Sequence, residues 1–468
     1  MSYISSVTRL RFGGKSVRTM LVFILGLNVL HAELPTIEGT MTEDYLPGLK
    51  SILAAALKQA PQMVLSEINL VQQAEYARIG AQAAMLPSLS GSGSYSIGQS
   101  APGSNPSAKS QSQGFYYSLG ISQSVFQFGA VKNQVEIAKI AELISHKNHA
   151  EAYRLFAANL RLQYVALIVQ KASLSSVTHR QKIAEALLKV EEEKLRNGTI
   201  SPGDLLGSQL SFEEARLAVA RAEQDYASAL RIFAHLVGMP AIEDSEIPAE
   251  IPKPTYSAEA AASIMALLRR DNAETTNAVQ VAAFYVRQAD LSYQITKVRL
   301  LPKFSAGAST TLSNSTSVSF GVISQDTVSS QSAGITGTWS IFDGFATGAA
   351  KKGALASKRA AEKSLQNQIQ LTLDNAESMQ KNLALTVQGL ALVERRGELA
   401  EAAMNKMKDE FQKGNVSQAV VDEATYGFYI YQAAVARARG ELLNKWADYI
   451  SLVGLDPAMN NLPARYAH

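Results

Sequence analysis

Four stretches of the chain alternate apolar and polar residues. They run through Leu89–Ile97, Phe115–Val125, Phe304–Leu312 and Ala333–Ile341. Period two is typical of a strand whose two faces differ, and about ten residues suit a tilted strand of an outer-membrane barrel. The polar positions are mostly Ser, Gly and Thr, which do not build a core, so we expect this face to line water. The alternative is an edge sheet of a soluble domain with its polar face in solvent.

The strands form two pairs, and each pair is interrupted by a stretch rich in Ser, Gly, Asn and Gln. These stretches, 99–113 and 314–331, are predicted to be exposed loops. Four strands per chain would leave two unpaired edges, which a membrane does not tolerate. Copies must therefore share one barrel. Two copies give an interior that side chains fill, whereas three copies give twelve strands and a lumen, so we expect a homotrimer.

Long helical runs follow each strand pair. Residues 130–197 contain no Gly or Pro, and 346–412 contain no Pro. At 1.5 Å per residue, such a run makes a rod of ~100 Å, which needs packed neighbours along its length. Each run ends in a turn, at Gly198 and at Gly414, and a shorter helix follows. Further helical segments are expected at 46–85 and 258–300, each ending before a Pro.

The same elements therefore occur twice, and the residues repeat with them. Ala218–Ala222 recurs as Ala434–Ala438, and Leu236–Gly238 recurs as Leu452–Gly454, both at a shift of 216 positions. We predict two structural repeats. The chain then divides into a signal peptide, a first repeat, a Pro-rich linker, a second repeat and a C-terminal tail: residues 1–32, 33–239, 240–256, 257–455 and 456–468.

The N-terminal segment has the order of a secretory signal peptide. Four bases and no acid precede or flank the apolar run Met20–Leu30, and Ala32 is a small residue where cleavage is expected. The run is too short for a permanent transmembrane helix. The alternatives are an N-terminal anchor or an ordinary amphipathic helix.

Composition and charge exclude several classes of protein. There are 44 Lys+Arg against 41 Asp+Glu, and the bases in excess lie in the leader, so a nucleic-acid binder is not expected. The chain has no Cys, which excludes disulfides, thiolate metal sites and Cys nucleophiles. His146 and His149 could share a metal, but without a carboxylate motif beside them a solvated helix face is favoured. We expect no enzyme, no catalytic residue, no cofactor and no metal.

Several short motifs occur in the same order in both halves. Leu86-Pro87 and Leu301-Pro302 precede the first strand of each pair, and Phe342-Asp343-Gly344 precedes the second long helix. In the first turn, Gly198 is followed by Ile200, Ser201, Pro202 and Asp204. With these motifs the chain resembles the TolC-type outer-membrane efflux proteins over nearly all of its mature length.

The resemblance implies a fold and a function. The fold is mainly α with membrane β: a trimeric α-helical periplasmic barrel continued by a shared twelve-stranded outer-membrane β-barrel. The function is passive export of drugs or proteins, as the exit duct of a tripartite efflux or type I secretion system. The implied partners are outer-membrane lipid, a periplasmic adaptor (membrane fusion) protein and an inner-membrane transporter of ABC, RND or MFS type. The implied location is the outer membrane, with a long periplasmic extension.

The turns of the two helical hairpins are the candidate entrance. Three acids near them, Asp204, Asp422 and Glu423, could form a ring of like charge around the axis of a trimer, or could only support helix starts. Ile200, Val416 and Val421 are the candidate adaptor contacts. The best-studied members of the family close the entrance with a Tyr and an Arg near the second turn. Phe411 and Val416 occupy those places here, so that lock is not expected.

Three other classes compete with an export duct. A periplasmic coiled-coil adaptor also has a helical hairpin, but it has one hairpin, and the repeat at a shift of 216 positions provides two. A filament or adhesin scaffold would explain the long helices but not the alternating strands. An enzyme has the least support.

Overall fold

The computed structural model of the protein describes residues 41–100, 110–319 and 322–458. The chain divides into two units, Met1–Glu38 and Gly39–His468, and every described residue belongs to the second. The expected signal peptide, 1–32, lies outside the described residues. No helix in the described part of the chain is both long enough and apolar enough to cross a membrane.

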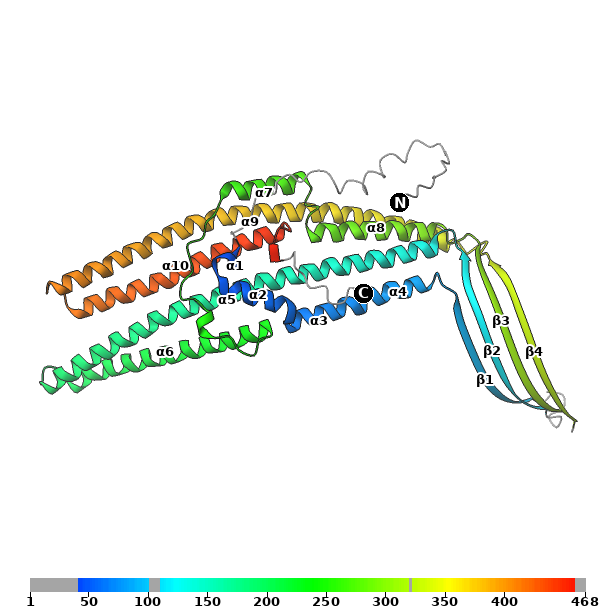
Figure 1. Cartoon of the computed structure of the whole chain (residues 1–468), viewed down its shortest axis with the longest axis horizontal. Helices are drawn as coiled ribbons and strands as arrows, with labels where there is room; N and C mark the ends of the chain where they lie inside the picture. Colours follow the sequence, from blue (N-terminus) through cyan, green and yellow to red (C-terminus); the bar gives the residue numbers. More distant parts are fainter. Residues whose placement is uncertain (1–40, 101–109, 320–321, 459–468) are drawn as a thin grey trace, which may run out of the picture. The chain divides into compact units, whose positions relative to one another are not determined.

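The described elements follow one another in two similar series (Figure 1). The first series comprises α1 (Thr42–Tyr45), α2 (Pro47–Gln59), α3 (Pro61–Leu70), the π-helical turn η1 (Val71–Glu75), α4 (Tyr76–Ala83), β1 (Ser88–Ser100), β2 (Ser110–Phe126), α5 (Ala130–Arg196) and α6 (Pro202–Val237). After the 3₁₀ turn η2 (Asp244–Glu246), the second series comprises α7 (Ala258–Arg270), α8 (Asn277–Lys297), β3 (Lys303–Ser319), β4 (Val322–Thr338), α9 (Ala346–Gln412) and α10 (Gln418–Leu452).

Both expected short helical segments are divided, which corrects the prediction of one helix in each. In 46–85 the break lies at Ala60, whose ψ of 130° is extended because the next residue is Pro61, the first residue of α3. In 258–300 the break lies between α7 and α8, where Asn272 and Ala273 adopt positive φ. Both breaks are marked in the sequence, the first by Pro61 and the second by the run Arg269–Ala278, which has no large apolar residue.

The strands are longer than predicted, and the expected loops are correspondingly shorter. The described parts of both expected loops, 99–100, 110–113, 314–319 and 322–331, continue the strands, because Ser, Thr and Gln side chains there pair across the ladder as readily as the apolar ones. The four antiparallel strands form one sheet in the order β1-β2-β3-β4. Strands β1 and β4 are therefore its two edges.

The helices lie side by side in one row (Figure 1). The two long helices, α5 and α9, run from the strands to the helix tips. Near the tips the order of contact is α6, α5, α10, α9, and nearer the strands it is α4, α5, α8, α9. One side of the row thus ends in α4 and α6, and the other side ends in α9.

The main hydrophobic core surrounds the middle of α5. Tyr153, Leu160 and Ile168 of this helix pack against α2, α6 and the linker, which contributes Ile247 and Ile251. Helix α10 closes on α5 at Gly440, where an added Cβ would come within 2.2 Å of a Val165 methyl group. A glycine fits there because the Val165 and Ile251 side chains already occupy the space that a Cβ would need.

Candidate functional site

The register of the sheet places the alternating residues of all four strands on two distinct faces. Ser92 pairs with Ser118, and Ser309 pairs with Ser332; in both pairs the hydroxyl oxygens lie about 3 Å apart, at 3.1 and 2.9 Å. We call this side the polar face: the even-numbered positions of β1, β2 and β4 and the odd-numbered positions of β3. It is mainly Ser, Thr and Gly, and its larger members are Tyr116, Lys303, Val322, Asp326 and Val328.

The opposite side, the apolar face, contains the large hydrophobic residues. Leu89, Ile121 and Ala308 stand directly opposite one another on neighbouring strands. Most side chains on both faces are exposed in the single chain. An exposed face with Leu, Ile, Tyr and Phe needs lipid or protein to cover it, whereas a face of small hydroxyls needs water.

Aromatic residues gather at two levels of the sheet. Near the β1–β2 turn, the Tyr95 and Phe115 ring centroids are 4.6 Å apart, and Tyr117 stacks on Phe115. At the helix end of the strands, Phe126 contacts Phe128. The ten residues from Tyr117 to Phe126 span ~30 Å along β2, which with strand tilt matches the ~25 Å apolar band between the aromatic girdles of outer-membrane barrels.

The first helix tip is held by its own residues. Gly198 has φ +67°, which allows the chain to reverse after α5. The Ser201 hydroxyl oxygen accepts a hydrogen bond from the Asp204 backbone N–H, and the Asp204 carboxylate accepts from the Ser201 backbone N–H at 3.0 Å. This capping box begins α6, with Pro202 as its first residue. The hydrogen bonds from Ser201 lower the pKa of Asp204, which stays an exposed anion.

The second tip is held differently. Gly414 has φ +77°, but Ser417, at the start of α10, makes no side-chain cap, and Val420 stands where the first tip has Asp204. Gln418 instead donates to the Asp422 carboxylate at 2.8 Å. The N-terminal turns of α10 are attached to α5, as the following contacts show.

Two neighbouring side chains of α5 bind α10 just after this tip. His179 Nε2 lies 3.2 Å from the backbone oxygen of Asp422, and Arg180 lies 3.4 Å from the Glu423 carboxylate. The Arg180 guanidinium also sits 5.3 Å from the centre of the Tyr426 ring. Asp422 and Glu423 are therefore brought together with α5, and among the described residues no hydrogen bond or ion pair joins either of them to Asp204.

The candidate adaptor contacts differ in exposure. Ile200 and Val416 are partly exposed at the two tips, and Phe411, which precedes the second turn, is 42% exposed. Val421 is only 6% exposed and packs within the chain. The surface that a partner could reach at the tips therefore includes Ile200 and Val416.

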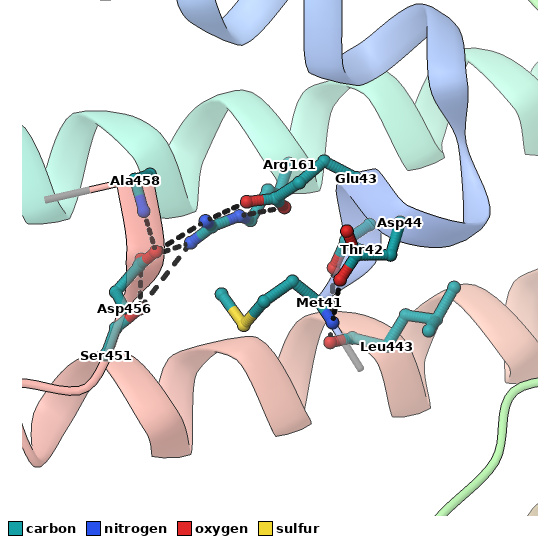
Figure 2. A network of polar contacts seen from close by, with 9 residues as sticks. All are labelled: Met41, Thr42, Glu43, Asp44, Arg161, Leu443, Ser451, Asp456 and Ala458. Carbon is teal, nitrogen blue, oxygen red and sulfur yellow. Dashed lines mark hydrogen bonds and ion pairs between the residues drawn. The ribbon is translucent and has the colours of Figure 1, made fainter. Parts of the chain in front are cut away.

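A buried charge network far from the tips was not found by sequence reasoning (Figure 2). Arg161 of α5 is 1% exposed and binds Glu43 of α1, with its Nη2 2.7 Å from Glu43 Oε1. On its other side Arg161 Nη1 lies 2.7 Å from Asp456, which follows α10. The available signal was a single Arg among the apolar positions of α5, between Leu160 and Tyr164, because a fully buried Arg requires acidic partners.

The pKa values in this network follow from burial and pairing. Burial alone would raise the pKa of Asp456, but the hydrogen bonds and charge of Arg161, with Ser451 and the Ala458 N–H, hold that pKa below its usual value. Burial likewise works against the charge of Arg161, and the two acids more than offset it, raising its pKa. In the described residues no group of three or more His, Asp or Glu side chains could hold a metal ion.

Comparison with known proteins relates this geometry to a family. The family model described as "Outer membrane efflux protein" matches residues 52–239 and 269–455. The chain belongs to the outer membrane efflux protein family. The two matched segments correspond to the two halves of the chain, each with its strands and its long helical hairpin. A comparison with curated protein sequences finds no match.

Solved structures share the fold of this outer membrane efflux protein at low sequence identity. The CmeC outer membrane channel of Campylobacter jejuni is 16% identical with a TM-score of 0.65, over 97% of this chain and 94% of that one. VceC of Vibrio cholerae is 15% identical with a TM-score of 0.61, over 88% and 97%. The open-state MtrE channel of Neisseria gonorrhoeae is 17% identical with a TM-score of 0.61, over 88% and 90%.

These findings confirm the family, the fold class and the location expected from the sequence. The protein is an outer membrane efflux protein whose mainly helical chain carries the four strands of a channel subunit, with the helices extending into the periplasm. It is the outer membrane exit duct of an efflux system, and the family is one of channels. The comparisons give no support to the adaptor or scaffold alternative.

Proposed function

We propose that three copies of this chain close into one duct, and that the two sides of the chain are the surfaces that join. The sheet ends in the unpaired edges β1 and β4, and the row of helices ends in the same order, with α4 and α6 on the β1 side and α9 on the β4 side. Joining the β1 side of one copy to the β4 side of the next leaves no edge in lipid once the ring is complete.

Exposed apolar residues follow both sides at helical spacing. On α9 they recur every seven residues or a multiple of seven, as in a coiled-coil seam: Leu371, Leu385, Leu392 and Leu399. The buried residues Leu383 and Leu390 are each two positions earlier, about 200° around the helix, so the exposed seam lies opposite the side that packs within the chain. On the other side of the chain, a matching set lies on α3, α4 and α6: Leu65, Ile68, Tyr76, Ile79, Leu206, Leu210 and Leu217.

The number three follows from the size of the barrel. Two copies give eight strands, whose interior is filled by side chains, whereas three give twelve and can leave a lumen lined by the polar face. Passive conduction of solutes through that lumen, without catalysis, is the function that this arrangement supports. The observation that carries the proposal is the coincidence of strand edges and apolar helix seams on the same two sides.

At the entrance, we assign separate roles to the three acids. Asp204 is an exposed anion at the first tip, and three copies would place one such charge per chain near the axis. Asp422 contacts His179 of α5 through its backbone oxygen, and the Glu423 carboxylate pairs with Arg180. This arrangement predicts that the Glu423 charge is compensated by Arg180, which leaves fewer uncompensated carboxylates than the nine possible if every acid faced inward.

The partners are proposed to be a periplasmic adaptor at the tips and an inner-membrane transporter behind it. Ile200 and Val416 are partly exposed apolar residues at the two turns, where an adaptor hairpin can cover them. The inner-membrane pump with which this duct works determines the cargo. Drug efflux and protein secretion would use the same conduit.

Two measurements test the proposal. Native mass measurement in mild detergent should give three chains, and the reconstituted protein should conduct in planar bilayers; a stable monomer would contradict the duct. In cells, photo-crosslinkers placed at Ile200 and at Val416 should capture a periplasmic protein, while the buried Val421 position serves as the matched control. Crosslinks from Val421 alone would place the adaptor elsewhere.

A further inference from the structure

The four described strands contain only two residues that carry a full charge at neutral pH. Strands β1 and β2 have none, β3 has Lys303 and β4 has Asp326. The register places both on the polar face, since Lys303 pairs with Thr338 and Asp326 pairs with Ser315. The apolar face of these strands therefore carries no charge. That placement is expected of strands with one face in lipid and one in water.

The two charges stand at opposite ends of the polar face. Lys303 is the first residue of β3, beside the helices, and Asp326 is close to the β3–β4 turn. The thirteen residues of β3 from Lys303 to Ser315, the partner of Asp326, span ~40 Å. Among the described residues no hydrogen bond or ion pair engages either side chain, and the polar-face neighbours of Asp326 are the neutral Ser315, Ser324 and Val328.

We propose that Asp326 and Lys303 set the charge selectivity of the duct's barrel. In a closed trimer, three Asp326 carboxylates form an anionic ring at the outer mouth, which attracts cationic solutes and metal cations. Three Lys303 ammonium groups form a cationic ring at the helix end, which attracts anionic ones. The hydroxyl wall between them is neutral and discriminates little by charge. The inference rests on the trimeric barrel of the proposed function, with its polar face inward.

The range of these rings determines how they must be measured. Charges in water are screened over ~8 Å at physiological ionic strength, so each ring acts on solutes close to it. The conductance of the whole duct would combine the effects of both rings with the effect of the entrance. A local probe on the polar face separates them, and the chain has no Cys, so a single introduced Cys is a unique reporter.

The experiment uses the trimer reconstituted in lipid vesicles, with Ser324→Cys two residues from Asp326 on the same face. Its rates of modification by cationic, neutral and anionic methanethiosulfonate reagents are measured at low ionic strength. The ratio of the cationic to the anionic rate should exceed that at Ser330→Cys, which is farther from Asp326. Adding Asp326→Asn should lower the ratio at Ser324→Cys several-fold, and Asp326→Glu should preserve it. At the other end, Ser305→Cys should show the inverse ratio, and Lys303→Gln should abolish it.

The outcomes distinguish this inference from the barrel itself. If Ser324→Cys reacts with the neutral reagent but Asp326→Asn leaves the ratio unchanged, the charge selectivity is wrong and the barrel stands. If Ser324→Cys and Ser330→Cys are inert while Ala333→Cys, on the apolar face, reacts, the polar face does not line water. Both the inference and the proposed barrel are then overturned.

Discussion

The long helices α5 and α9 have the same length of 67 residues and the same place in the two halves of the chain, yet they are buried very differently. Fifteen residues of α5 are buried, and only six of α9. Helix α5 has long neighbours on both sides of the row, whereas α9 is the last long helix of its side, with only the short α7 packed on it. The comparison teaches that one repeat supplies the core of the chain and the other an edge. The two sequence repeats therefore contribute differently to the stability of the chain.

The largest effect is expected where α5 carries its buried charge. Arg161→Met should lower the free energy of unfolding by ~3–5 kcal/mol, because it leaves Glu43 and Asp456 buried without their partner. Arg180→Met on the same helix is the matched control. Arg180 is half-exposed in its pair with Glu423, so its replacement should cost less than ~1 kcal/mol. Urea unfolding followed by circular dichroism measures the unfolding free energy of both variants. Equal losses would show that the buried Arg161 contributes no more than the half-exposed Arg180.

A second pair of variants compares leucines of the two long helices. Leu160→Ala on α5 should cost ~2–5 kcal/mol of unfolding free energy, since the side chain is fully buried. Leu392→Ala on α9 should change the unfolding free energy of the monomer by no more than ~0.5 kcal/mol, since that side chain is 55% exposed in the single chain. Leu392→Lys should instead reduce the yield of trimer, as measured by native mass spectrometry. A normal trimer with this charge would show that the α9 seam lies outside the interface.

Acid should weaken the α5 core through Asp456. The pKa of Asp456 is lowered in the folded state, so the unfolded state takes up its proton more readily. The stability from this group is present above the unfolded pKa of ~3.9 and is lost as pH falls through the lower folded pKa. Each unit of pKa difference corresponds to ~1.4 kcal/mol.

Asp448 has the opposite sign, because burial raises its pKa and acid relieves that cost. The unfolding free energy should therefore be measured from pH 7 downward in the Asp448→Asn background. In that background the opposite contribution of Asp448 no longer offsets the loss from Asp456. Asp456→Asn in that background should flatten the curve. If the loss of stability at low pH is unchanged in this variant, other carboxylates are its cause.

The smallest effect separates the two tips. Ser201→Ala removes the cap of α6 and should cost ~1 kcal/mol, with faster amide hydrogen exchange in the first turn of that helix. Ser417→Ala at the corresponding place should leave exchange in α10 unchanged, because Ser417 makes no side-chain cap. Equal acceleration at both tips would mean that the two turns are held alike.

The sequence predicted the features that depend on local pattern. Alternation located the strands, and the absence of Pro, together with the absence of Gly in the first run, placed α5 and α9 close to their observed limits. On α9, the buried residues Leu383 and Leu390 recur with the same spacing as the exposed residues Leu385 and Leu392. The sequence therefore could not show which of the two sets packs within the chain. The burial of Val421 and the attachment of Asp422 to His179 depend on α5 and α10 meeting, 243 positions apart in sequence. The role of Asp204 as a cap was predictable, because Ser201 stands three residues before it.

The buried arginine also constrains the order in which the protein can be completed. Arg161 follows Glu43 by 118 positions but precedes Asp456 by 295, so the second acid is synthesised and exported long after the guanidinium that needs it. Until the segment after α10 arrives, one side of Arg161 faces no acid, and closing the core around it is costly. Premature burial of α5 is thereby disfavoured in a half-exported chain. We therefore expect the network of Glu43, Arg161 and Asp456 to close only after the whole polypeptide has crossed, and the subunit to become rigid enough to assemble only then.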